Sequence, residues 1–388
     1  MLRFNQKIHY LLRSNITALY IVNSMRSFAL SLISIFIPVY LLQRNFTLVD
    51  VLIFLATAVT LQIFMSYFSL KHAFKKGIKQ SFYISMPAVI LFFILLYNIT
   101  FLSRNLGNVG TVLLLGLVVS VSNSFYWTGY HVEFAKFSKK KNSAKQLSTM
   151  NILSTAASVI APLIGALLIS LFSYDVTFIA IIIIFLISLI PLIISKDDHE
   201  PFDFKITNTM KKKYKDYVLP FFSEGLYSPA TAYYWPVMLY LVFTNLPKMG
   251  GIYFVSNALY AIAVYTTGQI LTNKNLYKLL RFGTIMHAIT LFVRGFVKDF
   301  TALIFIQGIG GISGPFFAIP YRKAFYDKSK DQGIAEIIYM RETYLNLGRL
   351  CSYLLLIALL FYIDTQIALI IMLIFSGIAI QGMNLMKA

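Results

Sequence analysis

The chain has 388 residues, of which 58% are apolar and only 13% are charged, and it carries a formal net charge of +19. A soluble protein of this size needs about a quarter of its residues charged to cover its core, so the composition excludes a cytosolic globular enzyme. The apolar runs are continuous and long enough to cross the roughly 30 Å hydrocarbon layer as helices. They are also unlike the short alternating strands of a membrane barrel. We therefore expect an all-α integral membrane protein.

Twelve apolar runs follow one another along the chain, and each is long enough for a transmembrane helix. They cover residues 17–43, 47–68, 81–99, 109–131, 147–172, 174–195, 217–243, 249–272, 279–297, 300–321, 338–362 and 365–385. The longest polar stretch, residues 196–216, is basic and lies between the sixth and seventh runs. The sequence therefore predicts an N-terminal bundle of six helices over 1–195, a linker over 196–216 and a C-terminal bundle of six helices over 217–388.

Basic residues alternate between the two sides of the predicted membrane. If the N-terminus is cytoplasmic, 26 of the 34 Lys and Arg fall on the cytoplasmic side and five on the other, Arg294 among these five. Short loops rich in Lys and Arg remain inside the cell. We expect both termini in the cytoplasm, a location in the plasma membrane and no nucleic-acid partner, because the charge sits in loops between spans.

Two segments of the first half recur in the second half. At an offset of 191, Tyr130, Phe134, Ser138, Lys139 and Ala144 coincide with Tyr321, Phe325, Ser329, Lys330 and Ala335. At an offset of 198, Pro38 matches Pro236, and Arg26 falls opposite Glu224. Parallel repeats of six helices related by an axis along the membrane normal are a known transporter design.

With these repeats, two local motifs make the whole chain similar to the major facilitator superfamily. The loop over 70–79, with Gly77 between lysines, resembles a degraded copy of that superfamily's loop after the second span. Ala161-Pro162-Leu-Ile-Gly165-Ala166 in the fifth span is similar to a signature of its drug/proton antiporter branches. The resemblance implies a monomer whose two bundles rock about a central site, with Gly77, Pro162 and Gly165 serving the movement. Small residues in the fifth span should allow close helix approach.

Arg26 and Glu224 are the ionisable residues placed well inside the first and seventh spans. Such residues usually face a bundle interior and mark a pathway. The resemblance places these two helices opposite each other, so we expect Arg26 and Glu224 to form a pair. The pair would gate the cavity, or Glu224 would bind a proton or a cationic substrate; a purely structural ion pair is the alternative.

Aromatic and hydroxyl side chains follow Glu224 at helical spacing and recur in the fourth span. These candidate lining residues are Ser228, Thr231 and Trp235 on one face with Glu224, Tyr227 and Tyr234 beside it, and Asn123, Tyr126, Trp127 and Tyr130 in the fourth span. They would suit a ring-containing, amphipathic or sugar-like ligand, or they are packing residues.

The eleventh span carries a polar stripe at helical spacing: Glu342, Asn346, Arg349 and Tyr353, with Arg341 next to Glu342. It predicts either an anion or proton-relay site or an Arg–Glu latch that holds the inner gate shut. His287 is expected to be a hydrogen-bonded core residue. His131 and Glu133 are expected to meet the loop lysines.

The function predicted from these features is secondary transport of a small molecule by alternating access. Export of amphipathic or drug-like compounds, coupled to protons, is the first hypothesis; uptake or uniport of a polar metabolite such as a sugar is the alternative, and a membrane receptor without transport is a third. The chain contains no nucleotide-binding loop and has a single cysteine, Cys351. We expect no enzymatic activity, cofactor or metal, and the lipid bilayer and the substrate as partners.

Overall fold

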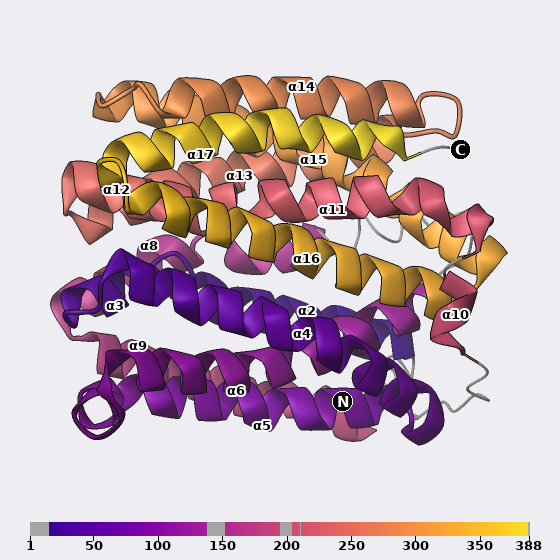
Figure 1. The fold of residues 1–388 in the computed structure, drawn as a ribbon, viewed down its shortest axis with the longest axis horizontal. Helices are drawn as coiled ribbons and strands as arrows, with labels where there is room; N and C mark the ends of the chain where they lie inside the picture. The colour runs from indigo at the N-terminus through magenta and orange to yellow at the C-terminus, as the bar shows by residue number, and fades with distance from the viewer. Residues whose placement is uncertain (1–14, 138–151, 195–203, 210, 387–388) are drawn as a thin grey trace, which may run out of the picture.

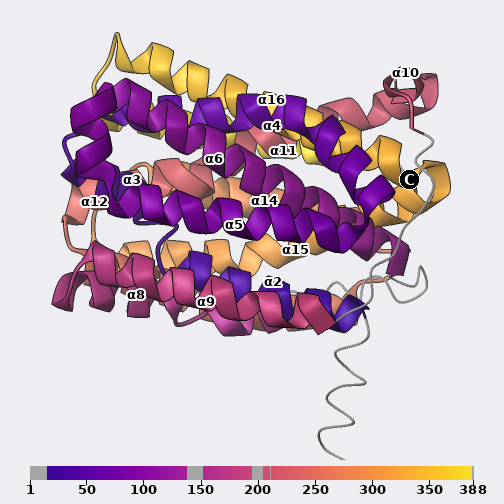
Figure 2. The ribbon, with the colours of Figure 1, turned by 90° about the horizontal axis from the view of Figure 1, so that it is seen from below.

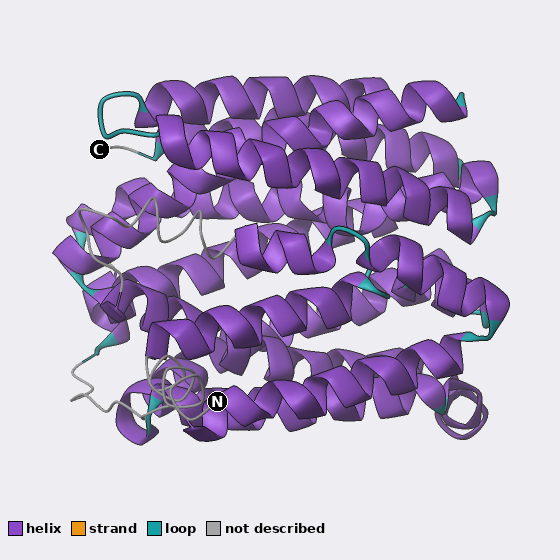
Figure 3. Cartoon of the chain, turned by 180° about the vertical axis from the view of Figure 1, so that it is seen from behind, coloured by secondary structure: helices purple, strands orange, loops and turns teal. Residues whose placement is uncertain are grey.

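The computed structural model describes residues 15–137, 152–194, 204–209 and 211–386. Within these ranges the chain is built from helices joined by short turns, without a strand (Figure 3). Ser138, Lys139 and Ala144 of the predicted repeat lie outside the described residues, as does the first part of the predicted linker.

The helices follow one another with few long connections. The first group is α2 (Asn15–Ser31), α3 (Ile37–Gln43), α4 (Leu48–Lys76), α5 (Ile78–Tyr97), α6 (Ile99–Phe137), α8 (Ala161–Leu171) and α9 (Tyr174–Ile194). In the linker lie α10 (Ile206–Thr209) and η2 (Lys212–Tyr214). The second group is α11 (Lys215–Pro229), η3 (Ala230–Tyr234), α12 (Trp235–Phe243), α13 (Leu246–Ile270), α14 (Leu276–Arg294), α15 (Phe300–Gln332), α16 (Ile334–Leu360), α17 (Thr365–Ala379) and η4 (Ile380–Leu385).

Ten helices of the described chain are long and apolar enough to cross a membrane. The two predicted spans missing from these ten are the first and the seventh, because each is interrupted. Residues 32–36 separate α2 from α3, and the π-helical turn η3 separates α11 from α12. Pro38 and Pro236, matched in the predicted repeat, lie in the first turns of α3 and α12, each shortly after one of these irregular segments.

Several helices extend beyond the apolar runs that predicted them. α4 continues to Lys76, so the loop expected over 70–79 shrinks to the turn at Gly77. Gly77 has φ 109°, a backbone conformation that favours glycine. α15 likewise continues to Gln332. Hydropathy marks where a helix can leave the lipid, whereas the helix itself ends where a turn residue stops it.

The helices run side by side along the long axis of the molecule (Figures 1 and 2), and Figure 1 shows α2–α9 on one side and α11–α17 on the other. The end that holds α10 and the C-terminus of α17 is here called the linker end, and the end that holds α3 and α12 the opposite end (Figure 1). Contacts between the two groups run mainly along α4 with α16 and α8 with α13.

Small residues bring α8 close to its neighbours, as the sequence predicts. A Cβ atom on Gly165 would collide with the carbonyl oxygen of Leu32, where the first span is interrupted. A Cβ atom on Gly250 of α13 would lie 2.8 Å from the carbonyl oxygen of Pro162. The motif around Pro162 and Gly165 therefore contacts two neighbours: the interrupted first span and α13 of the second group.

Candidate functional site

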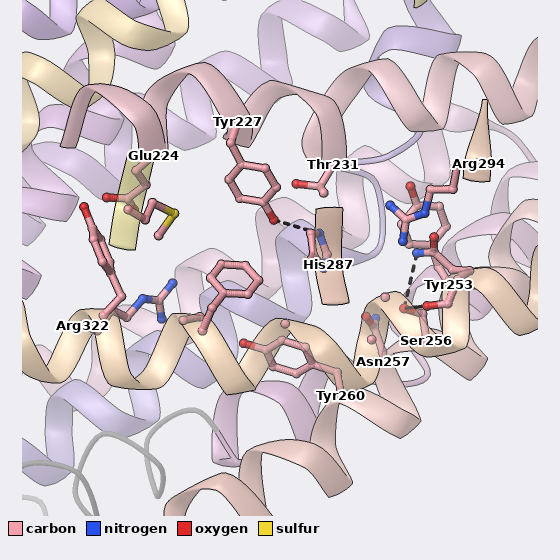
Figure 4. A pocket seen from close by; sticks show the side chains of 18 residues that line it. Glu224, Tyr227, Thr231, Tyr253, Ser256, Asn257, Tyr260, His287, Arg294 and Arg322 are labelled. Carbon is pink, nitrogen blue, oxygen red and sulfur yellow. Dashed lines mark hydrogen bonds between the residues drawn. The ribbon is translucent and has the colours of Figure 1, made fainter. Parts of the chain in front are cut away.

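A cavity of about 290 Å³ lies among α11, η3, α13, α14 and α15, and we call it the main cavity (Figure 4). Its volume is at the lower end of the range for small-molecule pockets. The wall carries charged, hydroxyl, amide and aromatic side chains: Glu224, Tyr227, Thr231, Tyr253, Ser256, Asn257, Tyr260, His287, Arg294, Gln307, Phe317, Tyr321 and Arg322. Glycines of α15 (Gly310, Gly311 and Gly314) open space on one side.

His287 lies at the middle of this wall (Figure 4). Its Nε2 atom is 3.1 Å from the Tyr227 hydroxyl and its Nδ1 atom is 2.7 Å from the Ser313 hydroxyl. His287 is thus buried and hydrogen-bonded, as expected, but it also lines the cavity, which the sequence did not indicate. The two bonds fix the Tyr227 ring at the cavity wall.

Arg294 marks one end of the main cavity, and Glu224 with Arg322 marks the other (Figure 4). Arg294 is 2% exposed, and its guanidinium lies 5.2 Å from the centre of the Trp235 ring. Among the described residues no hydrogen bond or ion pair involves it, and its Nε atom is buried without a partner. The sequence predicts Arg294 among the charges at the outer ends of the spans, whereas the structure buries its side chain inside the protein.

Arg341 is the centre of a buried ionic network near the linker end of the cavity. Its guanidinium donates to Glu224 at 2.7 Å and to Glu342 at 2.8 Å, and it lies 2.9 Å from Nε2 of His131. These residues come from α11, α16 and α6, so the network joins the two groups of helices. Within the described part of the chain His131 therefore contacts Arg341, whereas the loop lysines at 139–141 and 145, which His131 was expected to meet, lie outside the described residues.

The prediction that Arg26 and Glu224 form a pair is wrong. Arg26 donates to the Asn123 side chain at 3.2 Å, and its guanidinium stacks on Tyr126, 3.9 Å from the ring centre. Glu224 is instead held by Arg341. Equal depth in two helices does not bring two side chains together when a third helix, α16, supplies a nearer cation.

A second cavity of about 170 Å³, the interface cavity, lies between α4 and α6 on one side and α11 and α16 on the other. Asn123, Trp127, Ser228 and Arg349 line it. Arg349 donates to the Ser228 hydroxyl at 3.1 Å and to the Asn346 side chain at 3.2 Å. The face predicted on the seventh span is thus divided, because Ser228 points to this cavity while Glu224 and Thr231 point to the main one.

The remaining predicted residues fall into packing positions or smaller spaces. Tyr126 is fully buried and its hydroxyl donates to Asn23. Tyr130 and Trp127 line a space of about 120 Å³ with His131 and the Arg341 network. The Tyr234 hydroxyl is hydrogen-bonded to Ser352, and Tyr234 is not among the residues that line the main cavity. The Trp235 ring lies under the guanidinium of Arg294. Asn346 is fully buried within α16.

The two groups of helices touch at both ends of the molecule. At the linker end, the Nδ1 atom of His131 in α6 lies 2.8 Å from the Tyr326 hydroxyl of α15, and the ring centres of Phe134 and Tyr326 are 4.4 Å apart. These are the segments that the repeat at offset 191 relates. At the opposite end, Gln43 of α3 donates to the Tyr240 hydroxyl of α12 at 3.2 Å.

Backbone contact between α11 and α16 sets the geometry of the network. A Cβ atom on Gly225 would collide with the carbonyl oxygen of Leu345, and one on Gly348 with that of Phe222. Such close approach needs glycine on both helices. It holds Glu224 and Ser228 beside the arginines of α16.

Sequence reasoning missed several residues of the main cavity, namely Tyr253, Asn257, Tyr260, Arg294, Gln307 and Arg322. The only signal in the sequence was a run of polar and small residues within the eighth and tenth spans, where lipid-facing helices are apolar.

Comparison with known proteins supports the fold. No family model matches the chain. It is 22% identical over 356 residues to the uncharacterized protein YqgE of Bacillus subtilis (strain 168), covering 87% of this chain and 82% of that protein. Among solved structures, the human organic anion transporter MFSD10 (TETRAN) superposes with a TM-score of 0.66 at 9% identity, covering 97% of this chain and 99% of that one. At this level of identity the likeness concerns the fold alone, and this fold agrees with the predicted resemblance to the major facilitator superfamily.

Proposed function

We propose that this chain is a secondary transporter that moves a small organic molecule by alternating access. The observation that carries the proposal is the main cavity, a polar and aromatic chamber inside a bundle of membrane helices. Buried charge is costly in such a bundle and marks a pathway or site. A receptor without transport would be expected to have a sealed bundle, so the chamber favours the transporter.

The proposal includes twelve spans in two bundles of six, over 1–195 and 217–388. The interrupted segments α2–α3 and α11–η3–α12 supply the first and seventh spans beyond the ten continuous helices. Transporters commonly have broken helices beside their substrate sites, where a cavity surrounds the freed backbone groups. In the seventh span the corresponding irregularity is the π-helical turn η3, which carries Thr231 of the main cavity wall, and π turns are frequent at functional sites.

Movement between the bundles would use the contacts at their two ends. The contacts of His131 with Tyr326 and of His131 with Arg341 form the inner closure at the linker end, with the linker and both termini in the cytoplasm. The bond of Gln43 with Tyr240 belongs to the outer closure. Opening to one side requires one of these sets to separate while the other holds. Arg341 contacts both His131 and Glu224, so it links the inner closure to the cavity wall.

The substrate we propose is an amphipathic organic compound, and the direction is export coupled to protons. Tyr227, Tyr260 and Phe317 offer ring faces in the cavity, and Glu224 is its carboxylate. An anionic group on the substrate is compatible with the cationic lining, and MFSD10 is titled an organic anion transporter. Uptake or uniport of a polar metabolite such as a sugar is the second candidate, favoured by the hydroxyl and amide groups of the same wall.

The test is transport by purified protein in proteoliposomes containing a pH-sensitive dye. Wild type and Glu224→Gln are compared over amphipathic anions, lipophilic cations, sugars and amino acids. We expect substrate-dependent proton movement in the wild type and its loss in Glu224→Gln, with Glu336→Gln, an acid of α16 outside the cavity, behaving as wild type. Flux without proton movement, unchanged by Glu224→Gln, would remove proton coupling from the proposal. Absence of flux for every class would favour the receptor.

A further inference from the structure

At the Arg294 end of the main cavity, buried hydrogen-bonding groups lack partners within the described protein. This is the chemistry of a ligand-binding site. A guanidinium carries five donors and stays charged at physiological pH. Burial without a compensating partner costs several kcal/mol, and Arg294 has no hydrogen-bond or ion-pair partner among the described residues although it is 2% exposed. A charge kept in this state indicates that its partner comes from outside the chain.

The described residues around Arg294 leave room for its guanidinium and do not supply acceptors for its N–H groups. A Cβ atom on Gly310 of α15 would collide with the Nη2 atom of Arg294, so glycine at this position makes room for the guanidinium. The Trp235 ring lies 5.2 Å from it and can stabilise the cation through its face. Among the described lining residues no carboxylate lies at this end of the cavity; Glu224, the carboxylate in the wall, lies at the other end (Figure 4).

Further polar atoms at the same end also lack partners. The Tyr253 hydroxyl and the Oε1 atom of Gln307 are buried without a hydrogen bond in the described structure. The Gln307 amide nitrogen is already engaged by the Ser256 hydroxyl, at 3.3 Å. Tyr253 can therefore donate a bond to an anion beside Arg294, while Gln307 can accept one from a donor on the ligand.

The shape of the cavity indicates what is attached to the anion. From Gly310 to Tyr321, the cavity follows α15 for eleven residues, which corresponds to about 16 Å of helix. Tyr227, Tyr260 and Phe317 line the intervening length. An inorganic anion would fill only one end, whereas an aromatic or aliphatic acid would fill both the charged end and the apolar middle.

We propose, resting on the transport function above, that Arg294 anchors the carboxylate of the substrate and that the ligand's apolar body extends along Tyr260 and Phe317 towards Glu224. A carboxylate matches the planar fork of arginine better than a spherical ion does. The neutral amide of the same acid offers Arg294 one carbonyl acceptor but no negative charge, so the site discriminates between acid and amide.

Binding can be followed with one intrinsic reporter, because the chain has two tryptophans and Trp235 lies beside Arg294. In a Trp127→Phe background in lipid nanodiscs, Trp235 fluorescence is titrated with 3-phenylpropionate, 3-phenylpropionamide, acetate and inorganic phosphate. We expect saturable quenching by the aromatic acid, at least tenfold weaker binding of its amide and of the two small anions, and at least a tenfold loss in Arg294→Gln. Arg294→Lys should retain part of the affinity, and Arg281→Gln, an exposed arginine on the same helix, should bind as the parent does.

A stability measurement separates an anchor from a structural cation. Arg294→Gln removes an unpaired buried charge, so without ligand this variant should be at least as stable to heat as the parent. Binding sites commonly have such groups, which lower stability but serve function. Equal binding of acid and amide, absence of quenching by the acid up to millimolar concentration, or a marked loss of stability in Arg294→Gln with binding unchanged would each overturn the anchor. If the acid binds but does not cross proteoliposomes, the transport function fails and the anion site stands. If neutral compounds cross and acids do not bind, the anion site fails and the transport function stands.

Discussion

Replacing Arg341 with methionine tests whether one cation holds the network together. Arg341 donates to Glu224 at 2.7 Å and to Glu342 at 2.8 Å, and the three side chains are 9%, 16% and 8% exposed. Removing one partner of a buried ion pair typically costs about 3–5 kcal/mol, because it leaves a charge uncompensated. Here two carboxylates lose their cation, so we expect Arg341→Met to destabilise the protein by at least about 3 kcal/mol.

Neutralising the carboxylates should reverse most of that loss. In the triple variant Arg341→Met, Glu224→Gln, Glu342→Gln no buried charge of this group remains uncompensated, and replacement of a whole buried ionic group is often close to neutral. We expect the triple variant to regain about 2 kcal/mol relative to Arg341→Met. Glu224→Gln alone should cost less, about 1 kcal/mol, because Arg341 keeps Glu342.

The assay is unfolding by SDS in mixed micelles, followed by circular dichroism, with Arg281→Met as the exposed control, expected within about 0.5 kcal/mol of wild type. An Arg341→Met variant within about 1 kcal/mol of wild type would refute the reasoning, since that loss falls below the range for a broken buried pair. So would a triple variant less stable than Arg341→Met, because the carboxylates would then not be the source of the cost.

Two further predictions concern the packing and the movement of the helices. Gly348→Val should destabilise the protein by about 1–3 kcal/mol, because the valine side chain would meet the backbone of α11. Gly251→Val is the control: a Cβ atom there meets nothing within 4 Å, so it should cost clearly less stability in the same unfolding assay. In a Cys351→Ser background, a short cross-linker joining Gln43→Cys to Tyr240→Cys should stop transport and its reductive cleavage should restore it; undiminished transport by the cross-linked protein would show that the outer contact does not open.

The interior charges show where reasoning from the sequence stops. Arg26, Glu224, Arg341 and Arg349 could be identified as unusual because each lies in an apolar run. Their partners could not, because the partner of a buried side chain is chosen by the packing of helices distant in sequence. Arg26 stacks on Tyr126, and Glu224 pairs with Arg341, although the repeat places Arg26 and Glu224 at matching positions.

Arg294 shows a second limit. Hydropathy reports how far a residue lies along a span but not which way its side chain turns, so the sequence predicts Arg294 only as a charge at the outer end of the ninth span. The structure turns it inward beside Trp235, where Gly310 leaves space. The same reasoning applies to Ser228, whose direction is set by the contact of Gly225 with Gly348.

The sequence by itself determined that the chain is a helical membrane protein, because runs of apolar residues must be buried in lipid and a backbone in lipid must satisfy its own hydrogen bonds. It also placed a connection around Gly77, where the structure has a turn with a positive φ, because that conformation depends on local backbone geometry. Only the tertiary structure decided which side chains share a cavity. That depends on contacts between α11, α13, α14, α15 and α16, whose residues are far apart in the chain and whose pairing no local pattern encodes.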